Sequence, residues 1–401
     1  MDYRSDIVTG NKLMVSLMVS LFILSSIYAS PTNLRELVNS INDFSLRLYL
    51  KVRKEGENAI LSPFNVFTAL TLIYEGARGG TANKVRSILN LPVNTGRLRS
   101  SFHNLLTYLK SVNGLKITNA LWVQEGYHLL KDYINTVNRY YLANLRLLNF
   151  IKEPESSKEV INEWIREETG RRIKELIPPG GIDRQTRLVI TSVIYFRGIW
   201  LYRFNKSETK EGYFWVKPNK TIKIPFMHLR AKLPYFESNY VKVLELPFSD
   251  NKTCMVIFLP KEGLRSFENS LSIDKLHELL HKLKEVEVEV YIPKFKLSSG
   301  YSLAKILSEM GLRKLFTSEA DLSGISGKKD LYVKEIFHKA YTEVSEEGVE
   351  ATAATAAVIA LLALPVTFRA DKPFLFLILH KPTGLILFLG RLVNPKADNS
   401  G

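Results

Sequence analysis

The residues His277, Glu278 and His281 have the HExxH spacing found in zinc proteases. On a helix, two histidines four positions apart share one face, so both could bind Zn²⁺ while the glutamate acts as a general base. The same stretch, however, contains leucines spaced to form the apolar face of a short amphipathic helix. No third histidine follows in the pattern that zinc proteases use. We therefore expect a surface helix that holds no metal ion.

Other arrangements of catalytic side chains are missing from the sequence. It has no G-x-S-x-G nucleophile elbow and no recognisable Ser–His–Asp set. Its one cysteine, Cys254, lies in the apolar run CMVIFLP, which favours a buried thiol over a reactive one and excludes an internal disulfide. We therefore expect a protein that is not an enzyme and that uses no cofactor.

A long uncharged segment near the C-terminus is the most unusual feature of the sequence. It follows Glu346 and Glu347, and no charged residue occurs from Ala351 to Phe368. It could be an Ala-rich helix, a membrane span, a flexible linker or a β-strand held outside a sheet. The threonines disfavour a helix, Pro365 interrupts a span, and linkers are rich in Gly, Ser and Pro rather than in Ala, Val and Leu.

The fourth interpretation is favoured because small uncharged residues could enter a sheet without clash. Side chains on a strand alternate between its two faces. One face would carry Val349, Ala351, Ala353 and Thr355. The other face would carry Glu350, Thr352, Ala354 and Ala356, so the single charge would stay on the outer side.

The elements that must position this segment can be predicted from periodicity. Helical spacing of apolar residues predicts helices over 33–52, 99–110, 133–145 and 161–176, and Ser62-Pro63 predicts the start of another that ends near 75–81. Apolar runs predict strands over 58–61, 116–123, 187–200, 241–246, 255–259, 286–295, 374–379 and 385–389. Because helices and strands alternate without βαβ regularity, the pattern indicates an α+β fold.

Two segments carry a resemblance to a known family. LYVKEIFHKAYTEVSEEG and FRADKPFLFLILHKPTGLILFLGRLVNP, with the uncharged segment between them, resemble the hinge, reactive-centre loop and C-terminal strands of serpins. The resemblance extends from the first predicted helix to RLVNP. It implies one α+β domain over residues 30–401, with three β-sheets, about eight or nine helices and an exposed reactive-centre loop at about 346–370.

The resemblance also implies the function of a protease inhibitor that acts as a suicide substrate. A serine protease attacks the loop and forms an acyl-enzyme, and the cleaved loop then inserts into the main sheet before water can release the protease. The partner is thus a target protease held in a covalent complex with a monomeric inhibitor. The hinge that enters the sheet first would comprise Glu346, Glu347, Gly348, Val349, Glu350, Ala351, Thr352, Ala353, Ala354 and Thr355.

The reactive bond follows from the spacing that serpins keep. Counted forward from Gly348 and backward from Pro373, the family spacing gives the same bond, Leu362–Ala363. A leucine at this position suits the apolar specificity pocket of chymotrypsin-like, cathepsin G-like or elastase-like proteases. No Lys or Arg occurs between Glu350 and Arg369, which disfavours trypsin-like targets.

Serpins open their main sheet above a set of buried polar residues. The resemblance places this region at Ser62, Asn65, Ser192, Trp200 and His338. Two of these depart from the family pattern, since Asn65 replaces a usual serine and Ser192 a usual asparagine. We interpret the pair as an exchange that keeps one amide and one hydroxyl together.

The N-terminal part of the sequence suggests export. Lys12 precedes an apolar run that ends at Ala29, which predicts a signal peptide over residues 1–29 and a secreted, extracellular protein; an uncleaved anchor is the alternative. We expect the mature protein to lie outside the membrane. Three sequons, at Asn205, Asn219 and Asn251, are possible glycosylation sites.

The chain is basic, with 55 Lys and Arg against 40 Asp and Glu, and a net charge of +15. Such a surface can bind acidic polymers. Neither zinc-finger spacing nor a basic-region heptad suggests nucleic acid. Lys275, Lys282 and Lys284 could bind a glycosaminoglycan, although charged runs of this kind are usually solvated surfaces.

A non-inhibitory serpin that acts as a carrier or a chaperone-like binding protein is the alternative function. Such members carry bulky, charged or proline residues in the hinge. Here the hinge residues from Val349 onward are small and, apart from Glu350, uncharged, and Val349 is the one mild exception to the usual threonine. Valine is β-branched like threonine and suits a strand, so the hinge favours an inhibitor.

Overall fold

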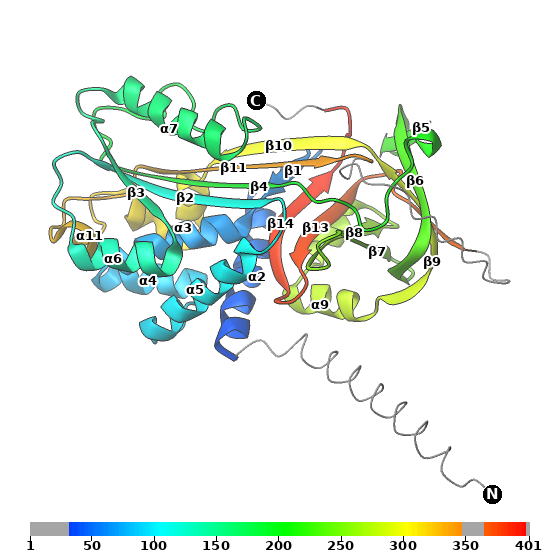
Figure 1. Ribbon diagram of the computed structural model, residues 1–401, viewed down its shortest axis with the longest axis horizontal. Coiled ribbons are helices and arrows are strands. Elements are labelled where there is room, and N and C mark those ends of the chain that lie inside the picture. Colours follow the sequence, from blue (N-terminus) through cyan, green and yellow to red (C-terminus); the bar gives the residue numbers. More distant parts are fainter. Residues whose placement is uncertain (1–31, 347–364, 398–401) are drawn as a thin grey trace, which may run out of the picture.

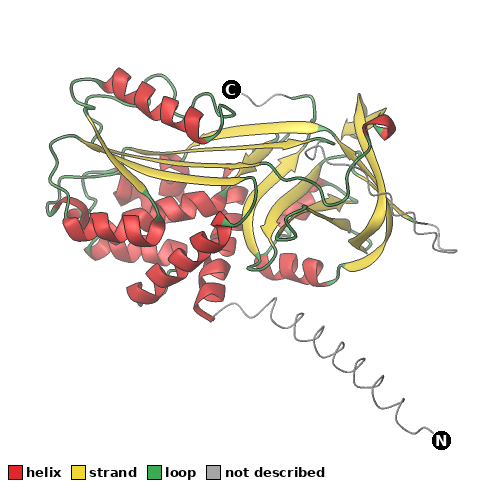
Figure 2. Ribbon diagram, viewed as in Figure 1, coloured by secondary structure: helices red, strands yellow, loops and turns green. Residues whose placement is uncertain are grey.

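The computed structural model describes residues 32–346 and 365–397. A five-stranded sheet runs along the long axis of the molecule, and most helices lie beneath it at one end (Figure 1). The other end is formed by a second, strongly bent sheet, so helices and strands are largely segregated (Figure 2). The expected α+β class is confirmed.

Ten α-helices lie in the described residues, against the eight or nine expected. Two of the ten have only four residues each. The helices are α2 (Thr32–Val52), α3 (Pro63–Gly76), α4 (Gly79–Leu89), α5 (Thr95–Lys110), α6 (Lys131–Tyr141), α7 (Pro154–Glu168), α8 (Leu264–Asn269), α9 (Ile273–His281), α10 (Ala304–Leu307) and α11 (Ser323–Ser326). Shorter helical turns are η1 (Lys206–Glu208), η2 (Ser308–Leu312) and η3 (Arg313–Phe316).

The five-stranded sheet has the order β10-β11-β4-β2-β3. Its strands are β2 (Leu115–Gln124), β3 (Asn144–Leu148), β4 (Leu188–Phe196), β10 (Phe295–Ser302) and β11 (Glu335–Val344). The two central strands, β11 and β4, pair in parallel, whereas each pairs antiparallel with its outer neighbour. As its unbroken apolar sequence predicts, β4 is buried on both faces.

The larger sheet has nine strands. They are β1 (Ala59–Leu61), β5 (Lys210–Lys217), β6 (Lys220–Glu237), β7 (Val241–Pro247), β8 (Thr253–Pro260), β9 (Lys284–Pro293), β12 (Val366–Arg369), β13 (Phe374–His380) and β14 (Leu385–Leu392). The 18-residue strand β6 pairs with β5 and β9 along most of its length, and with β7 only from Tyr235 to Glu237. This short contact links two groups of strands that would otherwise be separate sheets. The described residues therefore contain two hydrogen-bonded sheets where three were expected.

Helix α3 is the centre of the main core. It begins with Pro63, whose missing N–H is tolerated at the first helical position, and nearly every one of its side chains is buried. The helix lies under β4 and β2 and against α2 and β14. Because it is buried on all sides, its first turn is a fixed support under the centre of the five-stranded sheet.

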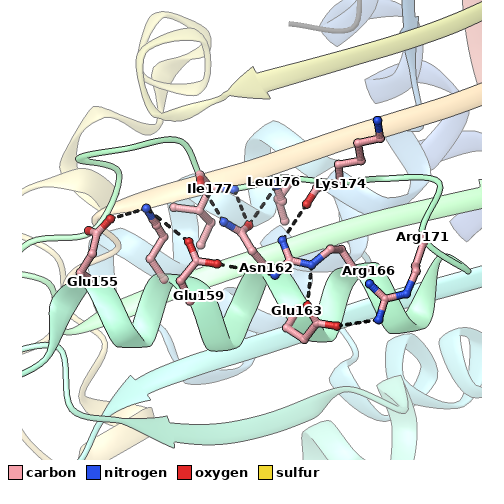
Figure 3. Close-up of polar contacts among 10 residues, drawn as sticks. Glu155, Glu159, Asn162, Glu163, Arg166, Arg171, Lys174, Leu176 and Ile177 are labelled. Carbon is pink, nitrogen blue, oxygen red and sulfur yellow. Dashed lines mark hydrogen bonds and ion pairs between the residues drawn. The ribbon is translucent and has the colours of Figure 1, made fainter.

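Helix α7 covers the opposite face of that sheet (Figure 1). Its residues Ile161, Trp164 and Ile165 pack with Trp122 and Phe337 of the sheet in a second, smaller core. The side chain of Asn162 accepts hydrogen bonds from the N–H groups of Leu176 and Ile177 and donates one to the carbonyl of Ile177 (Figure 3). These bonds tie the chain that follows α7 to the helix itself.

Two predicted helices extend past the C-terminal ends of the observed ones. The predicted helix 133–145 ends at Tyr141, because Leu142 adopts a left-handed backbone conformation (φ 51°) and the chain then enters β3. The predicted helix 161–176 begins at Pro154 and ends at Glu168, before Gly170 and Arg171 with φ of 56° and 61°. In both cases the apolar pattern continues past a backbone turn that ends the helix.

Candidate functional site

The two arms of the expected reactive-centre loop leave the fold from different sheets. The first arm leaves the end of β11, in the five-stranded sheet, and the second enters β12, in the larger sheet. Residues 366–369 pair with β9 and are not part of a free loop, so the expected loop of about 346–370 is too long at its C-terminal end. The hinge residues after Glu346 and the predicted bond Leu362–Ala363 lie outside the described residues.

The central strands of the five-stranded sheet separate near the first arm. Strand β11 stays paired with β10 up to Val344, but its pairing with β4 stops at Tyr341 and Tyr195. Beyond that pair lies a cavity of about 280 Å³. Its lining includes Tyr195, Trp200, Phe248, Tyr341, Glu343 and Val344. Since β4 ends at Phe196, the cavity lies between the end of β11 and the chain that leaves β4, at the place where the hinge begins.

His338 connects the two parallel strands with the helix below them. The backbone N–H of Ser62, at the start of α3, donates to His338 Nε2 at 3.0 Å. His338 Nδ1 therefore carries the proton and donates to the carbonyl of Ser192 in β4, also at 3.0 Å. Burial lowers the pKa of His338 to about 4, against the smaller opposing effect of the Ser192 bond, so the ring is neutral.

Asn65 lies in the same cluster and also binds β4. Its side-chain amide donates to the carbonyl of Val193 at 2.6 Å. The side-chain oxygens of Ser62, Asn65 and Ser192 are buried without a hydrogen-bond partner in the described part of the chain. The structure thus brings the exchanged amide and hydroxyl into one cluster, but the bond that is formed runs from the amide to the backbone.

Trp200 lies apart from this cluster, at the cavity between β4 and β11. Its ring stacks on Phe248 with the ring centres 4.7 Å apart. The indole N–H donates to the carbonyl of Ser345 at 3.0 Å. Trp200 therefore holds the end of β11 immediately before the hinge.

Glu346, the first residue of the predicted hinge, is buried and bound on two sides. Lys294 lies 2.6 Å from its carboxylate, and Thr209 donates a hydrogen bond of 2.6 Å to it. Burial by itself would raise the pKa of Glu346, but Lys294 and Thr209 together hold that pKa below its ordinary value. Nothing in the sequence indicates Lys294 or Thr209 as site residues, because neither lies near Glu346 in sequence and neither belongs to a motif.

The HExxH residues lie on α9, as the amphipathic pattern predicts. Leu276 and Leu279 are buried, and Glu278 forms an ion pair with Lys282. Burial and the neighbouring His281 lower the pKa of His277. Among the described residues, no group of three or more His, Cys, Asp or Glu side chains is arranged to hold a metal ion.

Two of the three lysines considered for a polyanion are already engaged. Lys275 lies over the ring of Tyr240, with its ammonium 4.8 Å from the ring centre. Lys282 pairs with Glu278 and lies over Phe236. Lys284 is exposed at the start of β9. These contacts show a solvated helix surface rather than a prepared row of free cations.

Asn205, Asn219 and Asn251 are all exposed, in turns between elements. Cys254 is buried in β8, and burial followed by Glu245 raises the pKa of its thiol. None of the helices in the described residues is both long and apolar enough to cross a membrane. The predicted signal peptide, residues 1–29, lies outside the described residues.

Comparison with protein families gives one clear match. A family model described as Serpin (serine protease inhibitor) matches residues 39–395. A serpin-like protein from Thermococcus kodakarensis is 39% identical over 372 residues, covering 90% of this chain and 86% of the relative. Leukocyte elastase inhibitor from Bos taurus is 36% identical over 369 residues, covering 88% of this chain and 97% of the relative.

Two solved structures show the same arrangement of elements. Uncleaved ovalbumin is 27% identical and superposes with a TM-score of 0.82, covering 90% of this chain and 100% of the other. Human thyroxine-binding globulin, crystallised with thyroxine, is 26% identical and superposes with a TM-score of 0.83, covering 91% and 100%. The similarity thus extends both to a protein named as an elastase inhibitor and to one named as a thyroxine-binding globulin.

Proposed function

Since this chain belongs to the serpin family, we propose that it inhibits chymotrypsin-like, cathepsin G-like or elastase-like serine proteases as a suicide substrate. The observation that supports this most strongly is the cavity beyond the Tyr341–Tyr195 pair, where β11 continues without β4 as a neighbour, next to a hinge whose residues after Glu350 are small and uncharged. An inserted strand that continues from β11 through a turn would run antiparallel to β11 and to β4. It would replace one parallel pairing with two antiparallel ones, which are slightly more stable per residue.

The chemistry is supplied by the protease. Its serine oxygen attacks the carbonyl carbon of Leu362, the bond to the Ala363 nitrogen breaks, and that nitrogen leaves as an amine after taking a proton. Leu362 is then an ester of the protease. Insertion of the hinge carries this ester across the sheet and distorts the protease before water can hydrolyse it. The inhibitor itself contributes the fold, the loop and the free energy of insertion.

Opening the sheet must break the contacts that His338, Trp200 and Lys294 make around β4 and β11. Neighbouring strands lie about 4.8 Å apart, so a strand placed between β4 and β11 moves each far from the other. The bond from His338 to the Ser192 carbonyl cannot survive that separation. Just after the C-terminal end of β11, the hydrogen bond from Trp200 to Ser345 and the ion pair of Lys294 with Glu346 must also change. These residues would therefore set the resistance to insertion.

Incubation of the protein with a panel of proteases, followed by denaturing electrophoresis, tests the proposal. We expect an SDS-resistant complex with a chymotrypsin-like or elastase-like enzyme, none with a trypsin-like enzyme, and a released peptide that begins at Ala363. Cleavage of the loop without any complex would reject inhibition. It would support the second candidate, a non-inhibitory binding protein, which the similarity to thyroxine-binding globulin makes worth testing with small apolar ligands.

We also propose that the protein is exported as a monomer and is glycosylated at one or more exposed sequons. The apolar run before Ala29 and the exposure of Asn205, Asn219 and Asn251 support this proposal. A mass decrease after glycosidase treatment of secreted protein, with an N-terminus near Ser30, would test it. Glycosaminoglycan binding through Lys275, Lys282 and Lys284 stays a prediction, which faster inhibition with added heparin would support.

A further inference from the structure

A second cavity lies beside β12, the strand into which the C-terminal arm of the loop leads. It has a volume of about 280 Å³ and lies where β12 meets the ends of β7 and β8. Its lining includes Lys242, Lys261, Thr367, Arg369, Asp371 and Lys372. None of these residues belongs to the hinge or to the region that opens the sheet.

Backbone carbonyls hold two of the lysines in the wall of this cavity. Lys242 donates to the carbonyl of Thr367 at 3.2 Å, and Lys372 donates to the carbonyl of Lys261 at 2.9 Å. No carboxylate in the described part of the chain lies within ion-pair distance of Lys372. The ammonium of Lys372 therefore keeps most of its capacity to bind an anion, and Lys242 has only a distant carboxylate partner, Glu237, at 3.7 Å.

The remaining charges of the cavity do not balance. Glu237 pairs with Lys261 at 2.7 Å and more distantly with Lys242 at 3.7 Å. Asp371 lies 3.7 Å from Arg369, whose guanidinium is also stacked over aromatic rings. Four cations thus face two carboxylates, which leaves an excess of two positive charges.

This excess has a cost in the free protein. Burial lowers the pKa of Lys372, Asp371 opposes the change, and repulsion from Lys242 and Lys261 lowers the pKa further. Lysines that only solubilise a surface normally extend away from one another into water. Here three of them converge on one cavity, and an anion bound in that cavity would relieve their repulsion.

The position of the cavity relates it to the reactive bond. Thr367 in its wall is only four residues after Ala363, and four extended residues span at most about 14 Å. A protease is wider than this, so an enzyme that cleaves Leu362–Ala363 must lie over or beside the cavity. The leaving-group side of its active site would face β12.

We propose that this cavity binds a carboxylate side chain at the rim of the target protease and so accelerates the encounter. The inference rests on the proposed inhibitory function and extends it, because it names a second recognition element outside the cleaved bond. An acidic protease residue fits better than a polyanion, since the cations surround one compact cavity instead of forming an extended row. Charge pairs of this kind raise association rates and weaken with salt.

The test compares two inhibitor variants that carry the same change in net charge. In Lys242→Gln/Lys372→Gln the cavity loses two cations. In Lys84→Gln/Lys131→Gln two exposed cations are lost from α4 and α6, at the end of the molecule opposite β6 and β9 (Figure 1). The association rate constant is measured with a protease that forms the covalent complex. We expect a decrease of about 5-fold for the cavity variant at low salt, and less than about 1.5-fold for the control.

The partner group is then located on the protease by replacing its acidic rim residues with amides one at a time. One replacement should slow inhibition by the unaltered chain but have no further effect on the cavity variant. Equal rates for cavity and control variants would overturn the proposal. So would a cavity variant that loses heparin binding but inhibits at the unaltered rate, because the cavity would then serve a polyanion.

Failure of this proposal can be told from failure of the proposed function. Complex formation by the unaltered chain tests inhibition itself, whereas the ratio of rates tests only the cavity. If the double variant does not fold, Lys242→Gln and Lys372→Gln are tested singly. Each should then reduce the association rate constant by about 2-fold.

Discussion

The ammonium of Lys294 lies 2.6 Å from the carboxylate of Glu346, the last described residue before the loop. The Glu346 side chain is 3% exposed and the Lys294 side chain 38%, so the pair is half buried. Lys294 follows the end of β9 and Glu346 follows β11. The ion pair thus joins the larger sheet to the start of the hinge.

Reversing the charge of Lys294 should destabilise the protein. In Lys294→Glu, two carboxylates meet at a buried position, and we expect a loss of about 2 kcal/mol in the free energy of unfolding. The matched control is Lys296→Glu, which breaks an exposed pair with Glu343 and should cost less than about 0.5 kcal/mol. The swap Lys294→Glu/Glu346→Lys should recover part of the loss. Equal unfolding midpoints for the two single variants would contradict this assignment.

The pH dependence of stability should report the burial of His338. Its pKa is about 4 in the folded protein and ordinarily about 6.5 in an unfolded chain. As the pH falls below 6.5, the unfolded state gains a proton that the folded state does not, so stability decreases until about pH 4. The full effect of this one group amounts to about 3 kcal/mol.

The matched variant His338→Gln removes this titration but leaves the other acids and bases unchanged. Unfolding midpoints are measured for both proteins from pH 7.5 to pH 4. The variant should be less stable at neutral pH, because it disturbs the bonds with Ser62 and Ser192, and the difference should narrow as the pH falls. Two parallel pH profiles would show that another group, such as His380 with its pKa also about 4, causes the loss.

Long regular elements could be predicted because their signals are local. The apolar spacing of α2 and the continuous apolar run of β4 are each contained in one stretch of sequence. The bounds of α2 were predicted to within one residue, whereas the strand predicted over 187–200 ends four residues earlier, at Phe196. The boundary of α6 was missed, because Leu142 takes a left-handed conformation that no residue preference suggests. Strands β5 and β6 were also missed, since many of their side chains alternate between exposed and half-buried positions.

The polar contacts of the site depend on residues far apart in sequence. The Glu346 bonds to Thr209 and Lys294 could not be predicted, because they arise only when three separate elements meet. The cluster of Ser62, Asn65, Ser192 and His338 was expected from family resemblance alone. No periodicity in the chain indicates that His338 binds both α3 and β4.

The side chain of Leu362 should determine which protease is inhibited. Leu362→Arg should lower the rate with chymotrypsin-like enzymes by at least about 10-fold and create inhibition of trypsin-like enzymes, because this residue enters the specificity pocket. Association rate constants with one enzyme of each class provide the measurement. The control Leu364→Arg adds the same charge two residues further on. If Leu364→Arg produces the switch and Leu362→Arg does not, the reactive bond has been placed wrongly.

The final prediction concerns insertion of the hinge. On β11 the buried residues His338, Ala340, Thr342 and Val344 alternate with more exposed ones, so the inner face of this part of β11 carries no carboxylate. In the inserted strand Ala353 should share that inner face. An arginine there would be buried without a partner, which costs several kcal/mol. Ala353→Arg should therefore slow insertion without changing the first attack at Leu362.

The variant should then behave as a substrate. The protease would cleave the same bond, little covalent complex would form, and active enzyme would be released because deacylation now outruns insertion. Electrophoresis and residual protease activity measure the number of inhibitor molecules consumed per enzyme inactivated, which should rise by at least about 10-fold. Glu350→Arg is the matched control, since it places the same side chain on the outer face and should change this number little. If Ala353→Arg traps protease as efficiently as the unaltered protein, the loop does not insert in this register, and inhibition must come from blocking the active site.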